Sequence, residues 1–290
     1  MAETKLELQH RELIDAIPND AVTHSGSFHS DDVYATAFLQ ILKPELKVSR
    51  VSKVPEGYQG LVYDIGGGEF DHHQKDKRYR ENRIPYAAFG LLWEKYGVCV
   101  VSERDAQRFD EQFIQDMDLS DNTGSRNMIA ESVAAFNPGW NTDENPDEMF
   151  FQAVAVAKQI LLRQFITMNC KEQATKEVKR IMEEQGAGRL LELKEHIPWK
   201  DAVYKTDVYY VLYPSNRGGF MVQAVADDYK APICKLPFPK AWRGQPQEVL
   251  EEVSGIRGLR FCHPSGFLCG TDSYGAARAV AKFMIERIGK

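Results

Sequence analysis

A short apolar run, followed by glycines and a histidine pair, constrains the fold of this chain more than any other feature. Residues 61–65 read Leu-Val-Tyr-Asp-Ile, and Asp71, His72 and His73 follow the glycines at 66–68. A continuous apolar run of this length is typical of a parallel strand that is buried on both faces. Asp64 interrupts the run, and a carboxylate there needs either a cation or the amides of the following glycines. The stretch therefore predicts a parallel α/β sheet with polar chemistry at the carboxyl end of a strand.

Two other clusters of histidine and aspartate add to this stretch. Their members are His24, His29, Asp31, Asp32, Asp118 and Asp121. The chain has seven histidines, and four of them lie in the first cluster or directly after Asp71. A lone histidine is usually an ordinary core or surface residue, but this collection of imidazoles and carboxylates predicts a metal site. The mixture favours Mn²⁺, and carboxylates also suit Mg²⁺.

Composition and charge argue against several classes of protein. A chain of 290 residues is long enough for two domains. The net charge of −6 argues against a broad electrostatic grip on nucleic acid, so a polyanion would need a local basic patch or bound metal. The five cysteines show no CxxC spacing, which indicates reduced thiols in the cytoplasm and argues against a zinc–cysteine module. Polar residues interrupt the longest apolar stretch, at 150–162, so we expect no membrane-spanning helix.

The order of the expected elements predicts two domains. Helical periodicity is expected at 33–42, 85–96, 102–117, 127–185 and 276–288. Strand patterns are expected at 48–54, 61–65, 207–213, 220–225, 258–262 and 266–269. Gly186 and Gly188 mark a boundary between a helical region and one richer in strands. We therefore expect an α/β domain over residues 1–187 and a smaller α+β domain over 188–290.

Four motifs in chain order resemble those of the DHH phosphoesterase superfamily. They are His24, His29 and Asp31, then Asp64, then Asp71-His72-His73, then Asp121. Further motifs resemble the melanocyte-proliferating-gene family within it: Thr-His-x-Gly-x-Phe-His-x-Asp at 23–31, Asn-Pro-x-Trp at 137–140, Pro-x-x-Trp-Arg-Gly at 239–244 and His-x-Ser-Gly-Phe at 263–267. The resemblance covers residues 20–288. It implies a DHH-type parallel sheet flanked by helices and a smaller C-terminal α+β substrate-binding domain.

The resemblance also implies roles for individual side chains. The metal ligands would be His24, His29, Asp31, Asp64, His72 and Asp121, with Asp64 bridging two ions. The catalytic group would be Asp64, Asp71, His72 and His73, with Asp71 orienting His72 and His73 facing the substrate phosphate. Two choices stay open here. The first is whether Asp31 or Asp32 is the metal ligand, and Asp32 is expected to start a helix. The second is whether Asp118 or Asp121 is the ligand, and both are expected at or just after a helix end.

A basic run after the histidine pair is the candidate grip for substrate. Its members are Lys75, Lys77, Arg78, Arg80 and Arg83, with Tyr79 and Tyr86 available for base stacking. The alternative is a solvated loop, which runs of charge often are. In the second domain, Arg243, His263 and Ser265 resemble the substrate-binding part of DHH enzymes. The predicted substrate-binding residues are therefore His73, Lys77, Arg78, Arg243, His263 and Ser265.

These patterns predict a metal-dependent phosphodiester hydrolase. Two ions ~3.5–4 Å apart can activate a water molecule and stabilise an in-line displacement. The resemblance implies exonuclease character, so the first choice is a 3′–5′ single-strand exonuclease on RNA or short oligonucleotides. The alternatives are a small-molecule phosphoesterase, cleaving a dinucleotide or pyrophosphate, and a non-enzymatic metal-dependent nucleotide-binding protein. The sequence identifies no protein partner.

Overall fold

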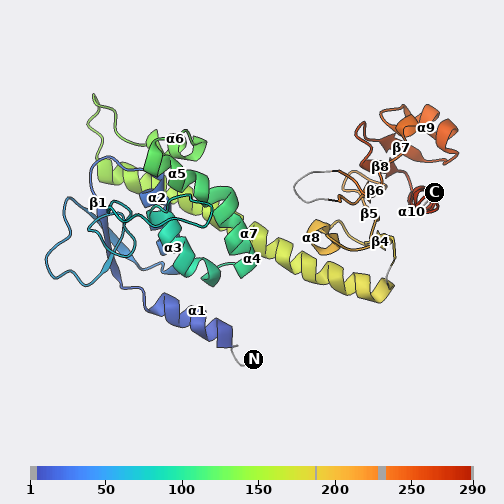
Figure 1. The fold of residues 1–290 in the computed structure, drawn as a ribbon. Helices are drawn as coiled ribbons and strands as arrows, with labels where there is room; N and C mark the ends of the chain where they lie inside the picture. The colour runs from blue at the N-terminus through green and yellow to red at the C-terminus, as the bar shows by residue number, and fades with distance from the viewer. Residues whose placement is uncertain (1–4, 187, 228–232, 289–290) are drawn as a thin grey trace. The chain divides into compact units, whose positions relative to one another are not determined.

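The computed structural model describes residues 5–186, 188–227 and 233–288, which form two compact units (Figure 1). The first unit is Met1–Asn169 and the second is Cys170–Lys290. Helix α7 (Pro146–Gln185) contributes residues to both units. The sequence places a domain boundary after residue 187, where α7 has ended, whereas the division in the structure falls inside the helix.

The first unit is built around a small parallel sheet. β1 (Asp20–His24) is central, with β2 (Lys47–Val51) on one side and β3 (Leu61–Val62) on the other. Both pairings are parallel, and His24 lies opposite Val51. Because parallel strands end at the same edge of a sheet, the residues that follow β1 and β3 lie close together. The predicted parallel sheet flanked by helices is confirmed.

β3 is shorter than the strand that the apolar run predicts. Only Leu61–Val62 pairs with β1 in the sheet. Asp64 has a φ of 55°, in the left-handed region that aspartate tolerates better than most residues. The chain then turns through Gly66 and Gly67, whose φ angles are 88° and 75°. This turn ends the strand and leaves Asp64 at the edge where β1 also ends.

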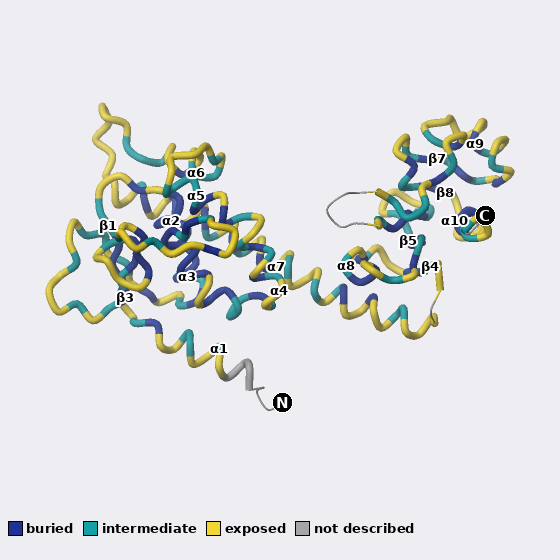
Figure 2. The backbone as a smooth tube through the Cα atoms, in the orientation of Figure 1, coloured by how far each residue is buried: buried dark blue, intermediate teal, exposed yellow. Residues whose placement is uncertain are grey.

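Helices supply most of the core of the first unit. They are α1 (Lys5–Asp15), α2 (Ser30–Leu42), α3 (Ala88–Tyr96), α4 (Glu103–Phe109), α5 (Gln115–Thr123) and α6 (Met128–Ala134). α2 is buried along almost all of its length, as Figure 2 shows, which explains the run of apolar and small residues from Val33 to Leu39. Phe38, Trp93, Phe109 and Phe165 form an aromatic cluster that joins α2, α3, α4 and α7.

α5 runs past the point where the sequence predicts a helix end. The helix predicted at 102–117 is α4, a π-helical turn at Asp110–Ile114 and the start of α5. α5 continues to the residue before Gly124, which has a φ of 70°. Asp118 and Asp121 therefore lie within a helix rather than after one, which corrects the prediction. Residues 118–123 are mostly polar and lack the helical spacing of apolar residues that predicts a helix. Tertiary contacts, such as the ion pair of Asp118 with Arg80, hold this part of α5 in place.

α7 is long and apolar enough to cross a membrane by the criteria of length and composition alone. Its Phe150, Val154 and Leu161 side chains are buried in the core of the first unit. The core helix of a protein passes the same test, so this observation is weak evidence for a membrane span.

The second unit is a mixed sheet with helices. Its strand order is β4 (Leu190–Glu192), β5 (Tyr210–Pro214), β6 (Phe220–Ala224), β8 (Leu268–Thr271) and β7 (Leu259–Cys262). β4 pairs with β5 in parallel, and the other neighbours are antiparallel. Helices α8, α9 and α10 complete the unit at Lys200–Val203, Gln247–Ser254 and Tyr274–Ile285. This arrangement agrees with the α+β region and the hairpin that the sequence predicts.

Candidate metal centre and active site

The candidate site forms where β1 and β3 end. His24 is the last residue of β1, and Asp64 follows β3 closely. The His24 Nε2 atom lies 3.2 Å from Asp32 Oδ2 and 3.2 Å from Asp64 Oδ2. The carboxylates of Asp32 and Asp64 raise the pKa of His24 to about 10. The pKa rises because these two buried carboxylates stabilise the positively charged form of the ring.

The first turn of α2 brings two buried carboxylates to this edge. Asp31 and Asp32 are both fully buried. Asp32 Oδ1 accepts a hydrogen bond from the His29 N–H at 2.9 Å, which caps the helix, while Asp32 Oδ2 faces His24. Asp31 Oδ2 lies 3.6 Å from His72 Nε2, and Asp31 Oδ1 has no hydrogen-bond partner among the described residues. Both aspartates belong to the cluster, because the capping role of Asp32 uses only one of its oxygens.

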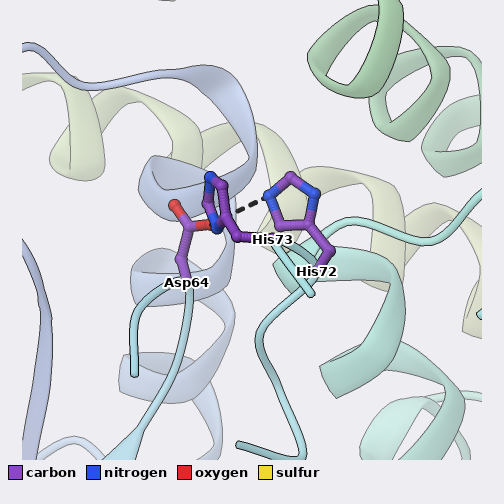
Figure 3. A group of neighbouring side chains, drawn as sticks. All are labelled: Asp64, His72 and His73. Carbon is purple, nitrogen blue, oxygen red and sulfur yellow. Dashed lines mark hydrogen bonds and ion pairs between the residues drawn. The ribbon is translucent and has the colours of Figure 1, made fainter. Parts of the chain in front are cut away.

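A single ring nitrogen of His72 faces three carboxylates. His72 Nε2 lies 3.0 Å from Asp64 Oδ1, 3.2 Å from Asp121 Oδ2 and 3.6 Å from Asp31 Oδ2. One ring nitrogen carries one proton or one lone pair, so it cannot form a good hydrogen bond with all three oxygens at once. A divalent cation among these atoms would bind all of them. Figure 3 shows the rings of His72 and His73 gathered at Asp64.

Burial and mutual repulsion give the carboxyl groups of the cluster unequal pKa values. Burial raises the pKa of Asp31 well above its usual range, and the nearby charge of Asp64 raises it further. Burial also raises the pKa of Asp32, against the lowering effect of His24. Burial alone would raise the pKa of Asp64 too, but its contacts with His24 and His72 lower it to about 2. The cluster therefore has more buried carboxyl groups than its histidines can neutralise, which is the condition that divalent cations relieve.

Three groups of donor atoms can be distinguished, and Asp64 belongs to two of them. The groups are His24, Asp32 and Asp64; Asp64, His72 and His73; and His29, Asp31 and Asp121. Within each group the donor atoms lie within 4.8 Å of one another. The structure thus brings together all six side chains that the resemblance implies as metal ligands, and it adds Asp32. The sequence signal for Asp32 was its place beside Asp31 at a helix start.

Asp71 orients His73 rather than His72, which differs from the role that the resemblance implies. Asp71 Oδ1 lies 2.7 Å from His73 Nδ1, and Asp71 Oδ2 accepts the Gly67 N–H at 2.6 Å. Burial opposes ionisation of Asp71, but the bonds with His73 and Gly67 lower its pKa. His72 Nδ1 instead lies 3.4 Å from Asn122 Oδ1. Asn122 was not predicted from the sequence, although it directly follows a predicted ligand.

A groove of about 650 Å³ opens beside the cluster. Asp64, His72, His73 and Lys77 line it, together with residues between 120 and 134. The Lys77 Nζ atom donates to Asn122 Oδ1 at 2.8 Å. Lys77 has no carboxylate partner in the part of the chain that the structure describes. Lys77 therefore belongs to the basic run and lines the groove beside the ligand cluster.

The two arginines that follow Lys77 in the basic run are engaged elsewhere. Arg78 Nη2 pairs with Glu94 at 2.6 Å on an exposed surface. Arg80 is buried, and its Nη2 atom lies 2.5 Å from Asp110 and 2.8 Å from Asp118. Arg80 therefore joins the segment after the histidines to the π-helical turn and α5. The expectation that Arg80 grips a phosphate is wrong, because its donors already bind two carboxylates.

Comparison with known proteins places the chain in a family. Residues 20–285 match the MYG1_exonuc family model, which is described as an uncharacterised protein family (UPF0160). The chain belongs to the MYG1 family. The resemblance to the melanocyte-proliferating-gene family is thereby confirmed.

MYG1 relatives match over most of their own length. The MYG1 protein of Dictyostelium discoideum is 27% identical, over 89% of this chain and 94% of its own. The MYG1 exonuclease of Homo sapiens is 25% identical, over 90% of this chain and 84% of its own. Among solved structures, RecJ from Thermus thermophilus in complex with Mn²⁺ has 14% identity and a TM-score of 0.28, over 98% of this chain and 55% of that chain. So low a TM-score supports no comparison between the two folds or sites.

The other predicted substrate-binding residues of this MYG1 family member lie in its second unit. Arg243 Nε donates to Phe238 O at 2.9 Å. His263 Nδ1 accepts the Ser265 N–H at 3.1 Å, and the centroids of the His263 and Phe267 rings are 4.4 Å apart. Arg243 and Ser265 line a cavity of about 790 Å³. A role for these residues in binding substrate stays a prediction.

Proposed function

We propose that this chain is a metal-dependent phosphodiester hydrolase that acts as a single-strand exonuclease on RNA or short oligonucleotides, with 3′–5′ polarity. The observation that carries the proposal is the single His72 nitrogen enclosed by three carboxylates at the carboxyl end of parallel strands. Relatives support the reaction class, because the MYG1 proteins of Homo sapiens, Rattus norvegicus and Mus musculus are named exonucleases.

The donor arrangement fits two divalent ions that share Asp64. One ion would be held by His24, Asp32 and Asp64, and the other by His29, Asp31, Asp64, His72 and Asp121. We assign Mn²⁺ because the set mixes imidazole with carboxylate, and Mg²⁺ is the second choice because carboxylates suit it. When bound, such ions supply an activated water and positive charge for displacement at phosphorus.

His73 and Lys77 are the residues of this chain that would hold the substrate phosphates. The His73 side chain is 63% exposed, and Asp71 holds its Nδ1 atom at 2.7 Å. The Asp71 carboxylate fixes the orientation of the exposed His73 ring beside the groove, with the other ring nitrogen left to face a substrate phosphate. Lys77 lines the same groove, where Asn122 holds its ammonium group at 2.8 Å. An oriented imidazole and a cation beside the ligand cluster favour a substrate with a phosphate at the metals and another next to it.

One observation favours a small-molecule substrate as the second candidate. Lys77 lines the groove, but Arg78 pairs with Glu94 and Arg80 is buried between two carboxylates. The net charge of −6 adds no broad attraction for a polymer. A dinucleotide or pyrophosphate needs fewer cationic contacts than a polymer needs, so this arrangement would suffice for it.

A cleavage assay with several substrates tests the proposal. End-labelled RNA, DNA and dinucleotides are incubated with the protein and Mn²⁺ or Mg²⁺, and the products are sized over time. We expect single-stranded RNA to shorten from its 3′ end, and we expect a chelator to stop the reaction. Shortening from the 5′ end would contradict the proposed polarity. Cleavage of the dinucleotides alone would favour the small-molecule enzyme, and nucleotide binding without any cleavage would indicate a binding protein.

Lys77→Ala should weaken the binding of a long single-stranded oligonucleotide and flatten its salt dependence. Each lost phosphate contact lowers the slope of log K against log salt by about 0.7 for a single strand. Fluorescence anisotropy at several salt concentrations measures both effects. Arg78→Ala is the comparison, because Arg78 was also predicted to bind substrate but its guanidinium pairs with Glu94, and it should change the slope less than Lys77→Ala does. An equal loss of slope in the two variants would contradict the assignment of the contact to Lys77.

A further inference from the structure

The loop that carries the first ligands has little backbone pairing of its own. Residues 25–29 join β1 to α2, with His24 before them and His29 at their end. The Ser25 N–H bonds to Val51 O at 2.9 Å, but the middle of the loop pairs with neither neighbouring strand. A metal site needs its donors held within about 0.5 Å of the binding geometry. Residues outside the loop must therefore hold it.

Asn137 supplies the partners for the middle of this loop. The Asn137 Oδ1 atom accepts the Phe28 N–H at 3.0 Å, and the Asn137 Nδ2 atom donates to Phe28 O at 2.9 Å. The side-chain amide thus pairs both backbone groups of Phe28, as a neighbouring strand would. Phe28 itself is fully buried and packs edge-on against Phe150, with 5.5 Å between ring centroids. Loss of the amide would leave two polar groups unpaired directly before His29.

Arg50 ties the same loop to the start of α7. Its Nη2 atom donates to Gly26 O at 2.7 Å, and its Nη1 atom donates to Asp147 Oδ1 at 2.8 Å. The Arg50 side chain has no exposed surface, and its guanidinium carbon lies 4.5 Å from the ring centroid of Phe150. Its Nε atom is buried without a hydrogen-bond partner among the residues that the structure describes. A buried arginine with an unpaired donor is costly, so stability alone does not account for its presence.

We propose that Asn137 and Arg50 clamp the first ligand loop to the segment 137–147. Both would then be positioning residues for metal binding. This inference rests on the metal site proposed above. One anchor holds Phe28 and the other holds Gly26, and both lie between the two histidines of the loop. The residues between the anchors, 139–145, are exposed (Figure 2). Because both anchors lie between His24 and His29, the clamp sets the separation of these two imidazoles, whose ring centroids are 6.0 Å apart.

Asn137→Ala tests the clamp, with Mn²⁺ alone as the probe and isothermal titration calorimetry as the measurement. We expect the Kd for Mn²⁺ to rise about 10- to 100-fold, which is the usual effect of losing a group that orients a metal ligand. The rise in melting temperature that Mn²⁺ causes in the wild-type protein should shrink in parallel, because a weaker ligand stabilises the folded state less. Circular dichroism without metal should show a folded protein.

Asn169→Ala is the matched control for this variant. The Asn169 side chain also bonds to a backbone carbonyl, donating from Nδ2 to Val100 O at 3.3 Å, in a pair that involves neither the ligand loop nor the segment 137–147. Asn169→Ala should leave the Kd for Mn²⁺ unchanged. Arg50→Lys is a second test that does not depend on Asn137→Ala folding. A lysine keeps the charge but cannot reach Gly26 O and Asp147 with two separate donors, so its Kd should also rise.

The two ways in which the idea can fail are distinguishable. If the wild-type protein binds Mn²⁺ and Asn137→Ala binds it with the same Kd, the clamp is overturned while the metal site and the proposed function stand. A lower melting temperature at an unchanged Kd has the same meaning, because it shows a structural role only. If the wild-type protein binds neither Mn²⁺ nor Mg²⁺, the clamp and the proposed function are overturned together.

Discussion

Asp64→Ala should abolish hydrolysis and reduce the bound Mn²⁺ while the protein stays folded. Asp64 belongs to two of the three donor groups, and its carboxylate lies 3.2 Å from His24 Nε2 and 3.0 Å from His72 Nε2. Its loss should therefore weaken both proposed ions. We expect the rate to fall more than about a hundredfold, which is the upper end for groups that only orient a ligand. Elemental analysis of the metal content and the cleavage assay measure the two effects.

Glu69→Ala is the control for this variant. Glu69 is an exposed carboxylate in the same turn, and it pairs with Lys95 at 2.9 Å, so its removal changes the charge equally without touching the cluster. Metal content and rate should stay at the wild-type values.

His72→Ala should resemble Asp64→Ala, because His72 Nε2 is the atom that three carboxylates surround. Wild-type metal stoichiometry in Asp64→Ala would show that Asp64 does not bridge two ions.

Arg80→Ala should lower the free energy of unfolding by about 3–5 kcal/mol, the usual cost of removing one partner from a buried ion pair. The guanidinium binds Asp110 through Nε and Nη2 and Asp118 through Nη2. Asp118 is fully buried, and this burial raises its pKa to about 7 against the lowering effect of Arg80. Without Arg80, this carboxyl group loses its cation. Urea denaturation monitored by circular dichroism measures the free energy.

Arg78→Ala is the control, because the pair of Arg78 with Glu94 is exposed and such pairs contribute at most about 1 kcal/mol. Gly90→Ala tests the same buried pair from the other side. A Cβ atom on Gly90 would lie 1.9 Å from Asp118 Oδ2 and 2.7 Å from Arg80 Nη2, so the pair would have to move. If Arg80→Ala costs no more than Arg78→Ala, the buried pair is not what holds α5 to the segment after the histidines.

Local sequence patterns were sufficient to predict the class of fold and the types of residue at the site. The strand predicted at 61–65 appears as the shorter β3, and the helix predicted at 33–42 appears as α2, which starts three residues earlier. The paired strands predicted at 207–213 and 220–225 appear as β5 and β6. Such patterns are local, because strand and helix periods and helix caps depend on neighbours within a few residues. The resemblance to the DHH phosphoesterase superfamily then placed His24 and Asp64 in one metal site.

Only the tertiary structure decided which side chains are partners. Asn122 reaches His72 across 50 positions, Arg80 reaches Asp118 across 38, and Asn137 reaches Phe28 across 109. Two cations of one run, Lys77 and Arg80, therefore differ completely, since one lines the groove and the other is buried between carboxylates. The sequence by itself determined many of the helices and strands and the kind of chemistry that is present. The partner of each charged side chain depends on distances between segments that are far apart in the chain. Those distances are fixed only when the helices pack against the sheet and bury their apolar side chains.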